Sequence, residues 1–499
     1  MSKKKKAILK SKAKLPKTLR GVHDLRRFFY RNETPIYFIS ATNFNLLGAD
    51  EWIKGFKFIT YIECFDGLHP NVISPQEEMP HEEFTSIEDI VNYLLEHKEV
   101  VDYIKERGPG KALFLMFDDK TEELAKQLGL ELAFPSAELR NYLDNKVVTN
   151  RIAEKADVPT VPNVLTKVDS FKTLRKVSEH LGDELVVQTP YGDSGHTTFF
   201  INTEDDWKKH ADEIIQEDEV KVMKRINCMG AAMEACVTRH GTIVAPLMTE
   251  LVGFKELTPY KGGWCGNEIY ADCFTPKIRR KARKYAEQFG NQLREEGYKG
   301  YFELDFLIDT DSGELYLGEL NPRVTGASSI TNHAVFALAD VPLFMFHIME
   351  WMDRDYQVSV NAINRRWHLP ENIDDWGQMV IKHTEDTILQ LIEAPKSGIY
   401  QMADNGKIHF DRMDTHRRAV ESDSEAFFLR IMKKGEYLYE GADMGIVVMR
   451  GRLMTDDFQL NDRARIWIDA IRGQFKSVEP ENLPSMERKV AEIGGFKMM

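Results

Sequence analysis

The spacing of apolar positions in the first third of the chain predicts strands that alternate with helices. Three apolar runs of strand length lie at Pro35–Ala41, Phe56–Cys64 and Lys111–Phe117. Segments with helical periodicity lie between and after them, at Ile87–Glu106 and Lys120–Leu128. Because strands that alternate with helices form parallel sheets, the pattern predicts a small parallel α/β unit near the N-terminus.

The middle of the chain has a different pattern. Ala137–Ala156 is strongly periodic and is followed by Pro159 and Pro162, so we expect one helix that ends before these prolines. After residue 351 the pattern changes to short strands and a last helix. The other elements that we expect are a short helix at Phe171–Leu181, a long helix at Thr275–Glu296, a last helix at Asp462–Gln474, and strands at Glu184–Gln188, Thr198–Ile201, Val220–Ile226, Ala232–Thr238 and Thr242–Leu251.

The most informative segment is a predicted hairpin with the sequence YFELDFLIDTDSGELYLGELNPRVTG. Tyr301–Ile308 and Glu314–Leu320 have the pattern of strands, and Asp309–Gly313 (DTDSG) between them is typical of a tight turn. We therefore expect the two strands to pair with each other.

Polar side chains on this hairpin are spaced so that they converge. Side chains two residues apart on a strand share a face, so Glu303 lies beside Asp305 and Glu319 lies beside Asn321. The turn brings Asp305 toward Glu319, and two carboxylates with an amide oxygen suit Mg²⁺. Arg323, just beyond, offers a planar fork for a carboxylate or a phosphate. A solvated hairpin with ordinary surface acids is the alternative, but it explains poorly why E-L-N-P-R ends an apolar strand.

The hairpin resembles the ATP-grasp superfamily, in which an acid on one strand is followed by a short turn and by an E-x-N strand end with a basic residue or proline after it. The resemblance extends over roughly Asp144 to Trp351. It implies that Asp305, Glu319 and Asn321 bind Mg²⁺, with Mn²⁺ as a second candidate, and that Arg323 holds the substrate or the transferred group. It further implies that ATP binds between two lobes and activates a carboxylate.

Two upstream segments extend the resemblance to the phosphates of ATP. DNKVVTNRIAEKADVPTVP is similar to a family segment in which Lys146 would reach a phosphate, although an exposed helix lysine is the alternative. ELVVQTPYGDSGHTTFFI is similar to the family's phosphate loop, in which Gly192, Ser194 and Gly195 would let backbone N–H groups approach the phosphates. A plain hairpin turn is the alternative there. The family usually has a lysine where this chain has Gln188, whose amide carries no charge.

A third segment, VKVMKRINCMGAAMEACVT, is similar to the adenine-binding linker of the family. The resemblance implies that Lys224, Arg225 and Ile226 line the adenine pocket and that Glu234 binds the ribose. Lys224 stands where an acid is usual, and a plain β-hairpin is the alternative. The Gly-rich segment Tyr260–Asn267 would either line an acceptor pocket or serve as a connector.

Composition excludes several other classes of protein. The 499 residues are 42% hydrophobic and 29% charged, which favours a large folded core, and the net charge of −13 argues against nucleic acid as the main partner. The five cysteines form no CxxC pair, so we expect neither a zinc site nor a disulfide framework, and a reducing cytoplasm fits best. Apolar runs near 18 residues are absent from the sequence, which predicts that the chain does not span a membrane.

The expected fold class is therefore α/β and α+β, with an ATP-grasp fold between two other domains. The predicted units are a basic, disordered tail at 1–30, an N-terminal parallel α/β domain at 31–143, an ATP-grasp domain at 144–355 with lobes at about 144–222 and 223–355, and a C-terminal mixed domain at 356–499.

Three functions remain open at this point. The first is a ligase that uses ATP to convert a carboxylate into an acyl phosphate, which an amine, a thiol or another nucleophile attacks. The second is a biotin-carboxylase-like enzyme, and the third is a protein that binds ATP without turnover, for which Gln188 is the only support. The sequence does not identify the carboxylate or the nucleophile, and it leaves open whether the chain forms a homodimer.

Overall fold

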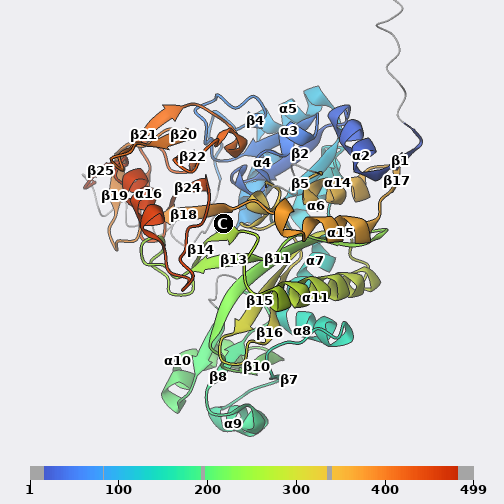
Figure 1. Ribbon diagram of the computed structural model, residues 1–499, viewed down its shortest axis with the longest axis vertical. Coiled ribbons are helices and arrows are strands. Elements are labelled where there is room, and N and C mark those ends of the chain that lie inside the picture. The colour runs from blue at the N-terminus through green and yellow to red at the C-terminus, as the bar shows by residue number, and fades with distance from the viewer. Residues whose placement is uncertain (1–15, 82–83, 193–196, 334–339, 481–499) are drawn as a thin grey trace, which may run out of the picture.

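The computed structural model describes residues 16–81, 84–192, 197–333 and 340–480 (Figure 1). The predicted disordered tail at 1–30 is wrong in its later part, because β1 (Thr18–Arg20) and α2 (Gly21–Tyr30) are formed there. Strand β1 pairs in parallel with β17 (Asp355–Gln357), and α2 buries Leu25 and Phe29. The apolar face of this helix therefore holds the start of the chain on the rest of the molecule.

The predicted N-terminal parallel sheet is confirmed. Its five strands have the order β4-β3-β2-β5-β6, and every pair is parallel. The segment predicted as one helix at Ile87–Glu106 is two helices, because His97 adopts an extended conformation between them. The elements of this unit are β2 (Ile36–Ser40), α3 (Ala49–Trp52), β3 (Phe56–Thr60), β4 (Val72–Ile73), α4 (Ile87–Glu96), α5 (Lys98–Arg107), β5 (Lys111–Phe114), α6 (Asp119–Gln127) and β6 (Glu131–Leu132).

The single helix predicted at Ala137–Ala156 is also two helices, α7 (Ala137–Asp144) and α8 (Lys146–Lys155). Asn145 separates them, with φ −71° and ψ 118°, and its side chain accepts hydrogen bonds from two N–H groups of α8. Buried positions recur at intervals of three or four residues across the break, so the sequence periodicity runs through it. The break puts Lys146 in the first turn of α8.

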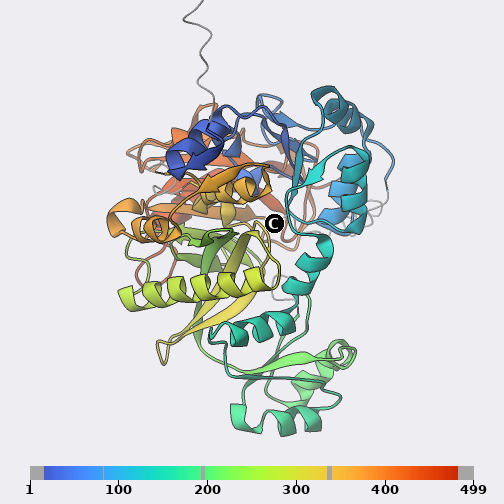
Figure 2. The same ribbon diagram turned by 90° about the vertical axis from the view of Figure 1, so that its right-hand side faces the viewer.

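A four-stranded antiparallel sheet forms a small lobe at one end of the molecule (Figures 1 and 2). Its strand order is β7-β10-β8-β9, and a separate apolar cluster fills the space between the sheet and its two helices. The elements are β7 (Asn163–Thr166), α9 (Phe171–Val177), β8 (Leu185–Gln188), β9 (Thr198–Ile201), α10 (Glu204–Ile215) and β10 (Val220–Lys224).

The largest sheet has 11 strands and joins the middle of the chain to its C-terminal part. The Gly-rich segment Tyr260–Asn267, which we predicted as a loop, enters β14 (Trp264–Ile269), a central strand that pairs with β13 and β18. The first half of the sheet and its helix consist of β11 (Cys228–Thr238), β12 (Gly241–Val244), β13 (Met248–Val252), β14, α11 (Pro276–Glu295), β15 (Gly300–Asp309) and β16 (Leu315–Asn321).

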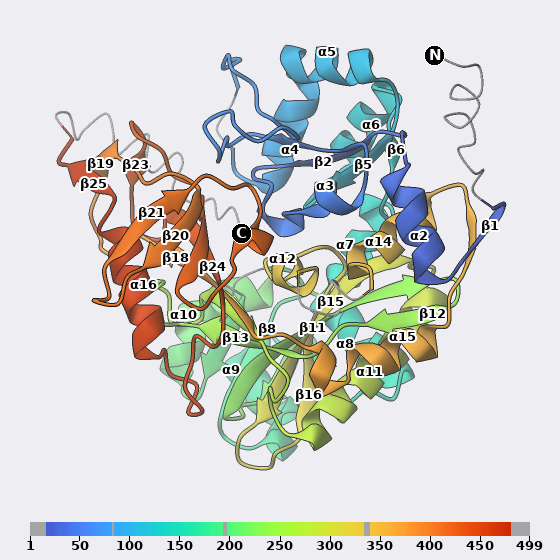
Figure 3. The ribbon, with the colours of Figure 1, turned by 45° about the horizontal axis from the view of Figure 1, so that its top comes forward.

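The C-terminal strands continue this sheet through the pairing of β14 with β18. The domain boundary at residue 355 stays a prediction, since strands from both sides of it share one sheet. Figure 3 shows α12 (Ser328–Thr331) at the centre of the molecule, below the N-terminal sheet and beside the C-terminal strands. The remaining elements are α14 (Leu343–Trp351), α15 (Val360–Trp367), β18 (Trp376–Lys382), β19 (Leu389–Glu393), β20 (Gly398–Met402), β21 (Ile408–Arg412), β22 (Glu425–Arg430), β23 (Tyr437–Leu438), β24 (Asp443–Arg450), α16 (Asp462–Arg472) and β25 (Lys476–Val478).

Two sequence predictions about the whole chain can be compared with this fold. All five cysteines lie among the described residues and are free. In the described part of the chain, every helix is too short or too polar to cross a membrane.

Candidate active site

The hairpin β15–β16 brings together the side chains that the sequence predicted. The antiparallel register pairs Asp305 with Glu319 and Glu303 with Asn321. Asn321 Nδ2 donates hydrogen bonds to Glu303 Oε2 at 3.2 Å and to Asp305 Oδ2 at 3.1 Å. The predicted oxygen ligands therefore lie on one face of the hairpin.

A fourth acid, Glu250 of β13, joins this group and was missed by the sequence analysis. Burial and then the charge of Glu319 raise the pKa of Glu250 to about 7. Burial also raises the pKa of Asp305 well above its usual value, with further contributions from Glu250 and Glu319. The signal was present in the sequence, because Glu250 interrupts the apolar strand MTELV. The acids repel one another, and they would bind a cation between them.

Lys146 connects the hairpin to the small lobe. Its Nζ donates to Glu319 Oε1 at 2.7 Å and to the carbonyl oxygen of Gly192 at 2.5 Å, and only 6% of the residue is exposed. The alternative of an ordinary exposed helix lysine is therefore excluded. Arg323 lies beside the acids, where its charge lowers the pKa of Asp305, and it forms no ion pair with any described residue.

Gln188, the departure from the family pattern, faces a buried lysine that the sequence analysis did not single out. The register of β8 with β10 pairs Gln188 with Lys221, which is 2% exposed. Burial lowers the pKa of Lys221 to about 8, while Glu319 opposes this shift and Lys146 adds to it. Gln188 Nε2 donates to Thr198 Oγ1 at 3.1 Å, and its buried Oε1 has no partner among the described residues. A lysine in the apolar strand VKVMK was the available signal.

The predicted phosphate loop is described only in part. Gly192 has φ +133°, and a Cβ atom there would overlap the Thr197 side chain, so the position requires glycine. Ser194 and Gly195 lie outside the described residues. The Gly192 carbonyl that contacts Lys146 is the described link between this loop and the acids.

The three residues predicted at the adenine differ in their surroundings. The N–H groups of Lys224 and Arg225 donate to the carbonyl oxygens of Pro162 and Glu184, each at 3.0 Å, and both side chains are exposed. Ile226 instead packs on an apolar cluster between the small lobe and the hairpin, formed with Val161, Val186, Met223, Leu307 and Tyr316. Of the three, Ile226 is the one whose side chain packs on this apolar cluster.

The ribose role predicted for Glu234 does not fit its position. Its carboxylate is completely buried and accepts hydrogen bonds from Ser328 Oγ at 2.5 Å, from Thr325 Oγ1 at 3.3 Å and from the Tyr301 hydroxyl. These hydroxyl groups satisfy the carboxylate within the protein, and no exposed surface is left on it for a sugar. Glu234 connects β11 to the segment that follows the hairpin.

The donor set suits a divalent cation. Carboxylate and amide oxygens are the ligands that Mg²⁺ prefers, and four acids in a partly buried group leave negative charge for a cation to neutralise. Within the described ranges, no three His, Cys, Asp or Glu side chains already form a metal-binding group. Glu319 bonds to Lys146, and Asn321 presents its Nδ2 rather than its oxygen to the acids. Metal binding would therefore require both side chains to reorient.

Solved structures share this architecture over most of the chain. The biotin carboxylase domain of 2-oxoglutarate carboxylase from Hydrogenobacter thermophilus, in complex with MgADP, ADP and bicarbonate, is 12% identical with a TM-score of 0.57, covering 94% of this chain and 97% of that one. Biotin carboxylase from Campylobacter jejuni is 13% identical with a TM-score of 0.57, covering 89% and 92%. Carboxyaminoimidazole ribonucleotide synthase from Aspergillus clavatus, in complex with ATP, is 13% identical with a TM-score of 0.51, covering 89% and 99%.

Sequence comparison gives a weaker result. No protein-family model matches the chain. Urea amidolyase of Saccharomyces cerevisiae is 24% identical over 251 residues, which are 48% of this chain and 13% of that protein, so the chain matches only a small part of its length. The neighbouring structures are ATP-grasp enzymes, and their likeness covers 89% to 94% of this chain. The chain therefore has the ATP-grasp fold.

Proposed function

We propose that the chain is an ATP-dependent ligase that activates a carboxylate as an acyl phosphate for attack by an amine or another nucleophile. The observation that carries the proposal is the 2.7 Å contact between Lys146 and Glu319 on the hairpin that also bears Asp305 and Asn321. It joins a cation suited to a phosphate with oxygen ligands suited to a metal.

Residues for the phosphates, the adenine ring and the metal of MgATP would all come from this region. Lys146 and Lys221 would neutralise phosphate oxygens, and the apolar cluster around Ile226 would receive the adenine ring. Asp305, Glu319 and Asn321 would hold Mg²⁺, which supplies positive charge next to the phosphates. Arg323, which has no ionic partner among the described residues, would orient the substrate carboxylate.

The chemistry needs mainly orientation and charge neutralisation. A carboxylate oxygen of the substrate attacks the γ-phosphorus, the bond from this phosphorus to the bridging oxygen breaks, and ADP leaves with the electron pair. An amine then attacks the acyl carbon, loses a proton to solvent, and phosphate departs. Lys146 and Arg323 hold the two reactants in line, which lowers the entropic part of the barrier.

Biotin carboxylation is a second candidate. Its specific support is the TM-score of 0.57 to two biotin carboxylase structures, against 0.51 to carboxyaminoimidazole ribonucleotide synthase. In this reaction bicarbonate would be the carboxylate that ATP activates, and biotin would be the nucleophile.

ADP release tests both candidates. The chain is incubated with ATP, Mg²⁺ and a panel of carboxylic acids, with and without amines, and in parallel with bicarbonate and biotin. We expect ADP only when Mg²⁺ and an acid are present, and dependence on bicarbonate plus biotin would select the second candidate. Tight ATP binding without ADP release on the whole panel would contradict both candidates and favour a binding protein.

A further inference from the structure

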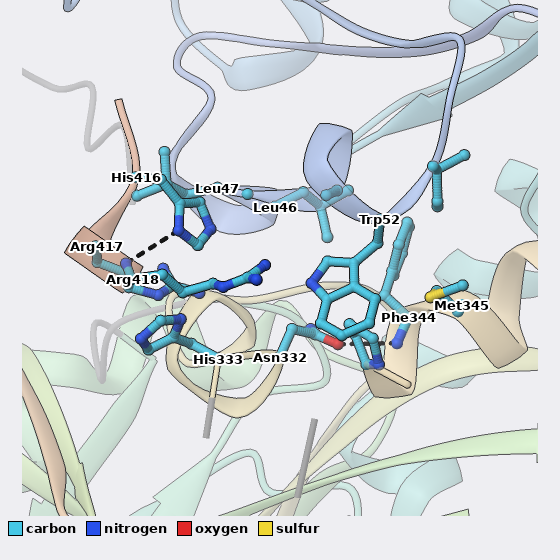
Figure 4. A pocket seen from close by; sticks show the side chains of 14 residues that line it. Leu46, Leu47, Trp52, Asn332, His333, Phe344, Met345, His416, Arg417 and Arg418 are labelled. Carbon is cyan, nitrogen blue, oxygen red and sulfur yellow. Dashed lines mark hydrogen bonds between the residues drawn. The ribbon is translucent and has the colours of Figure 1, made fainter. Parts of the chain in front are cut away.

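A pocket lies between segments from the N-terminal part of the chain, from the region of α12 and from the segment before β22 (Figure 4). Its walls come from the N-terminal segment Leu46–Ile53, from Asn332 and His333 after α12, and from His416–Arg418 before β22. The pocket offers about 20 Å³ to the centres of water-sized groups, within a hollow of about 430 Å³ that includes open solvent. None of the residues proposed to bind ATP or Mg²⁺ lines it.

Arg417 is a buried cation without a counterion among the described residues. It is 1% exposed, and its Nη2 donates to the carbonyl oxygen of Ser329. Its Nε and Nη1 are buried and have no hydrogen-bond partner, and it forms no ion pair in the described part of the chain. A buried guanidinium with unsatisfied donors is strongly unfavourable unless an anion compensates it.

The neighbouring groups add the cation Arg418, which is paired with Glu51, and a histidine nitrogen without a described partner. His333 is 2% exposed, and its buried Nε2 has no partner in the part of the chain that the structure describes. Its ring lies 5.7 Å from that of His416. Arg418 forms an ion pair with Glu51 at 2.6 Å, so this acid is already engaged by another cation. Burial lowers the pKa of Arg417 to about 9, with Glu51 acting in the opposite direction.

The pocket is shaped by close packing between the N-terminal and C-terminal parts. Gly48 has φ +87°, and a Cβ atom there would overlap the His416 ring, so glycine allows the two segments to meet. The guanidinium carbon of Arg418 lies over the Trp52 ring, 5.4 Å from the ring centroid. This contact fixes the wall of the pocket beside Arg418.

We propose that this pocket binds an oxyanion group, a carboxylate or a phosphate, held by the free donors of Arg417 and by His333. That the group belongs to a small-molecule substrate rests on the proposed function. The position supports this, because Asn332 lines the pocket and donates to the Tyr301 hydroxyl of β15 at 3.1 Å, which links the pocket to the hairpin strand. The site would hold the anionic end of a substrate whose reacting end lies toward Arg323.

Titration calorimetry with inorganic phosphate and with acetate tests the site directly. The full chain carrying Lys146→Met is the background, because this change removes a cation of the proposed ATP site. We expect one of the two anions to bind, and Arg417→Met to weaken its binding at least about tenfold, since a charge-assisted hydrogen bond is lost. Arg430→Met is the matched control, because Arg430 is also buried but is paired with Asp66 at 2.7 Å.

Thermal unfolding separates a ligand site from a structural arginine. Without anion, Arg417→Met should keep the wild-type midpoint, because a buried unpaired charge is replaced by an apolar side chain. The anion should raise the midpoint of wild type and of Arg430→Met but not of Arg417→Met, and Arg417→Lys should restore part of the rise. No binding of either anion by the parent chain, or equal binding after Arg417→Met, would overturn the proposal. Neither result depends on ATP turnover, so the ligase proposal is tested separately.

Discussion

At the scale of single residues, charge decides what the hairpin can bind. Burial is the main cause that raises the pKa of Asp305, Glu303 and Glu250, and the charges of neighbouring acids, Glu319 among them, raise these pKa values further. Burying acids together in this way costs stability, so such a group is retained where a bound cation offsets the repulsion.

Removing one of these charges should lower the activity without lowering the thermal stability. We expect Asp305→Asn to lower Mg²⁺-dependent ADP release at least about a hundredfold, roughly 2.7 kcal/mol, because a metal ligand is lost. The thermal midpoint should stay the same or rise, because a buried like charge is removed while volume is kept. Glu319→Gln should behave in the same way in the ADP assay. Wild-type turnover in either variant would refute the metal assignment.

Replacing Lys146 should lower kcat/KM for ATP more than replacing Gln188. We expect Lys146→Met to lower kcat/KM for ATP at least about tenfold, roughly 1.4 kcal/mol, since a charge-assisted phosphate contact is lost. Gln188→Met should cost less, because an amide makes only a neutral hydrogen bond. Steady-state kinetics with varied ATP compares them. If the Lys146→Met variant turned over normally and the Gln188→Met variant were inactive, Gln188 and not Lys146 would be the residue that contacts the phosphates.

The position of Lys221 determines whether the substitution Gln188→Lys strengthens or weakens ATP binding. Because Lys221 lies directly opposite Gln188, the variant Gln188→Lys places two cations together and should weaken ATP binding. The exchange Gln188→Lys with Lys221→Gln keeps one lysine in the pair and should restore affinity. Isothermal titration with ATP measures both, and tighter ATP binding by Gln188→Lys alone would show that Lys221 does not serve this site.

At the scale of elements, a single cap sets the position of Lys146. The Asn145 side chain accepts from the N–H groups of Val147 and Val148, and the N–H of Lys146 donates to Pro190 O at 2.8 Å. The break between α7 and α8 thus aligns the start of α8 with the phosphate loop. Sequence periodicity missed it, because a one-residue break hardly disturbs a pattern of 3.6 residues per turn.

Loss of this cap should lower both the thermal stability and the affinity for ATP. Asn145→Ala should cost about 1 kcal/mol of stability and also weaken ATP binding, because the start of α8 loses its anchor. Ser170→Ala removes the corresponding cap of α9 in the small lobe and is the matched control. It should lower the thermal midpoint similarly and leave ATP affinity unchanged. Equal ATP affinities in the two variants would show that the break does not position Lys146.

At the scale of the whole molecule, the C-terminal strands complete the sheet that bears the site. Strand β18 pairs with β14 over Gly266–Ile269, and one apolar core extends from the N-terminal sheet to the C-terminal strands. Residues after 355 therefore contribute to the folding of the residues before it.

Truncation tests this dependence. A chain that ends at residue 355 exposes the edge of β14 and much of the shared core, so we expect it to aggregate or to lack cooperative unfolding. Circular dichroism during heating, with the full chain as control, is the measurement. A truncated chain that unfolds cooperatively would show that the domain boundary predicted from the sequence is a folding boundary.

The sequence by itself determined the local parts of this protein. The parallel strands, the hairpin and the convergence of Asp305 with Glu319 follow from apolar periodicity, turn residues and the two-residue repeat of a strand, which all act over short distances. Gly192 and Lys146 were identified by resemblance, and the structure brings these two together.

Only the tertiary structure decided what lies across from these residues. Glu250, Lys221 and Arg417 come from strands or loops far apart along the chain, and Glu234, which the sequence assigned to a ligand, is enclosed by hydroxyl groups. The break at Asn145 and the central place of β14 likewise depend on their packing partners. Sheet register and burial are set by residues distant in the sequence, so no local pattern specifies which charges end up buried together.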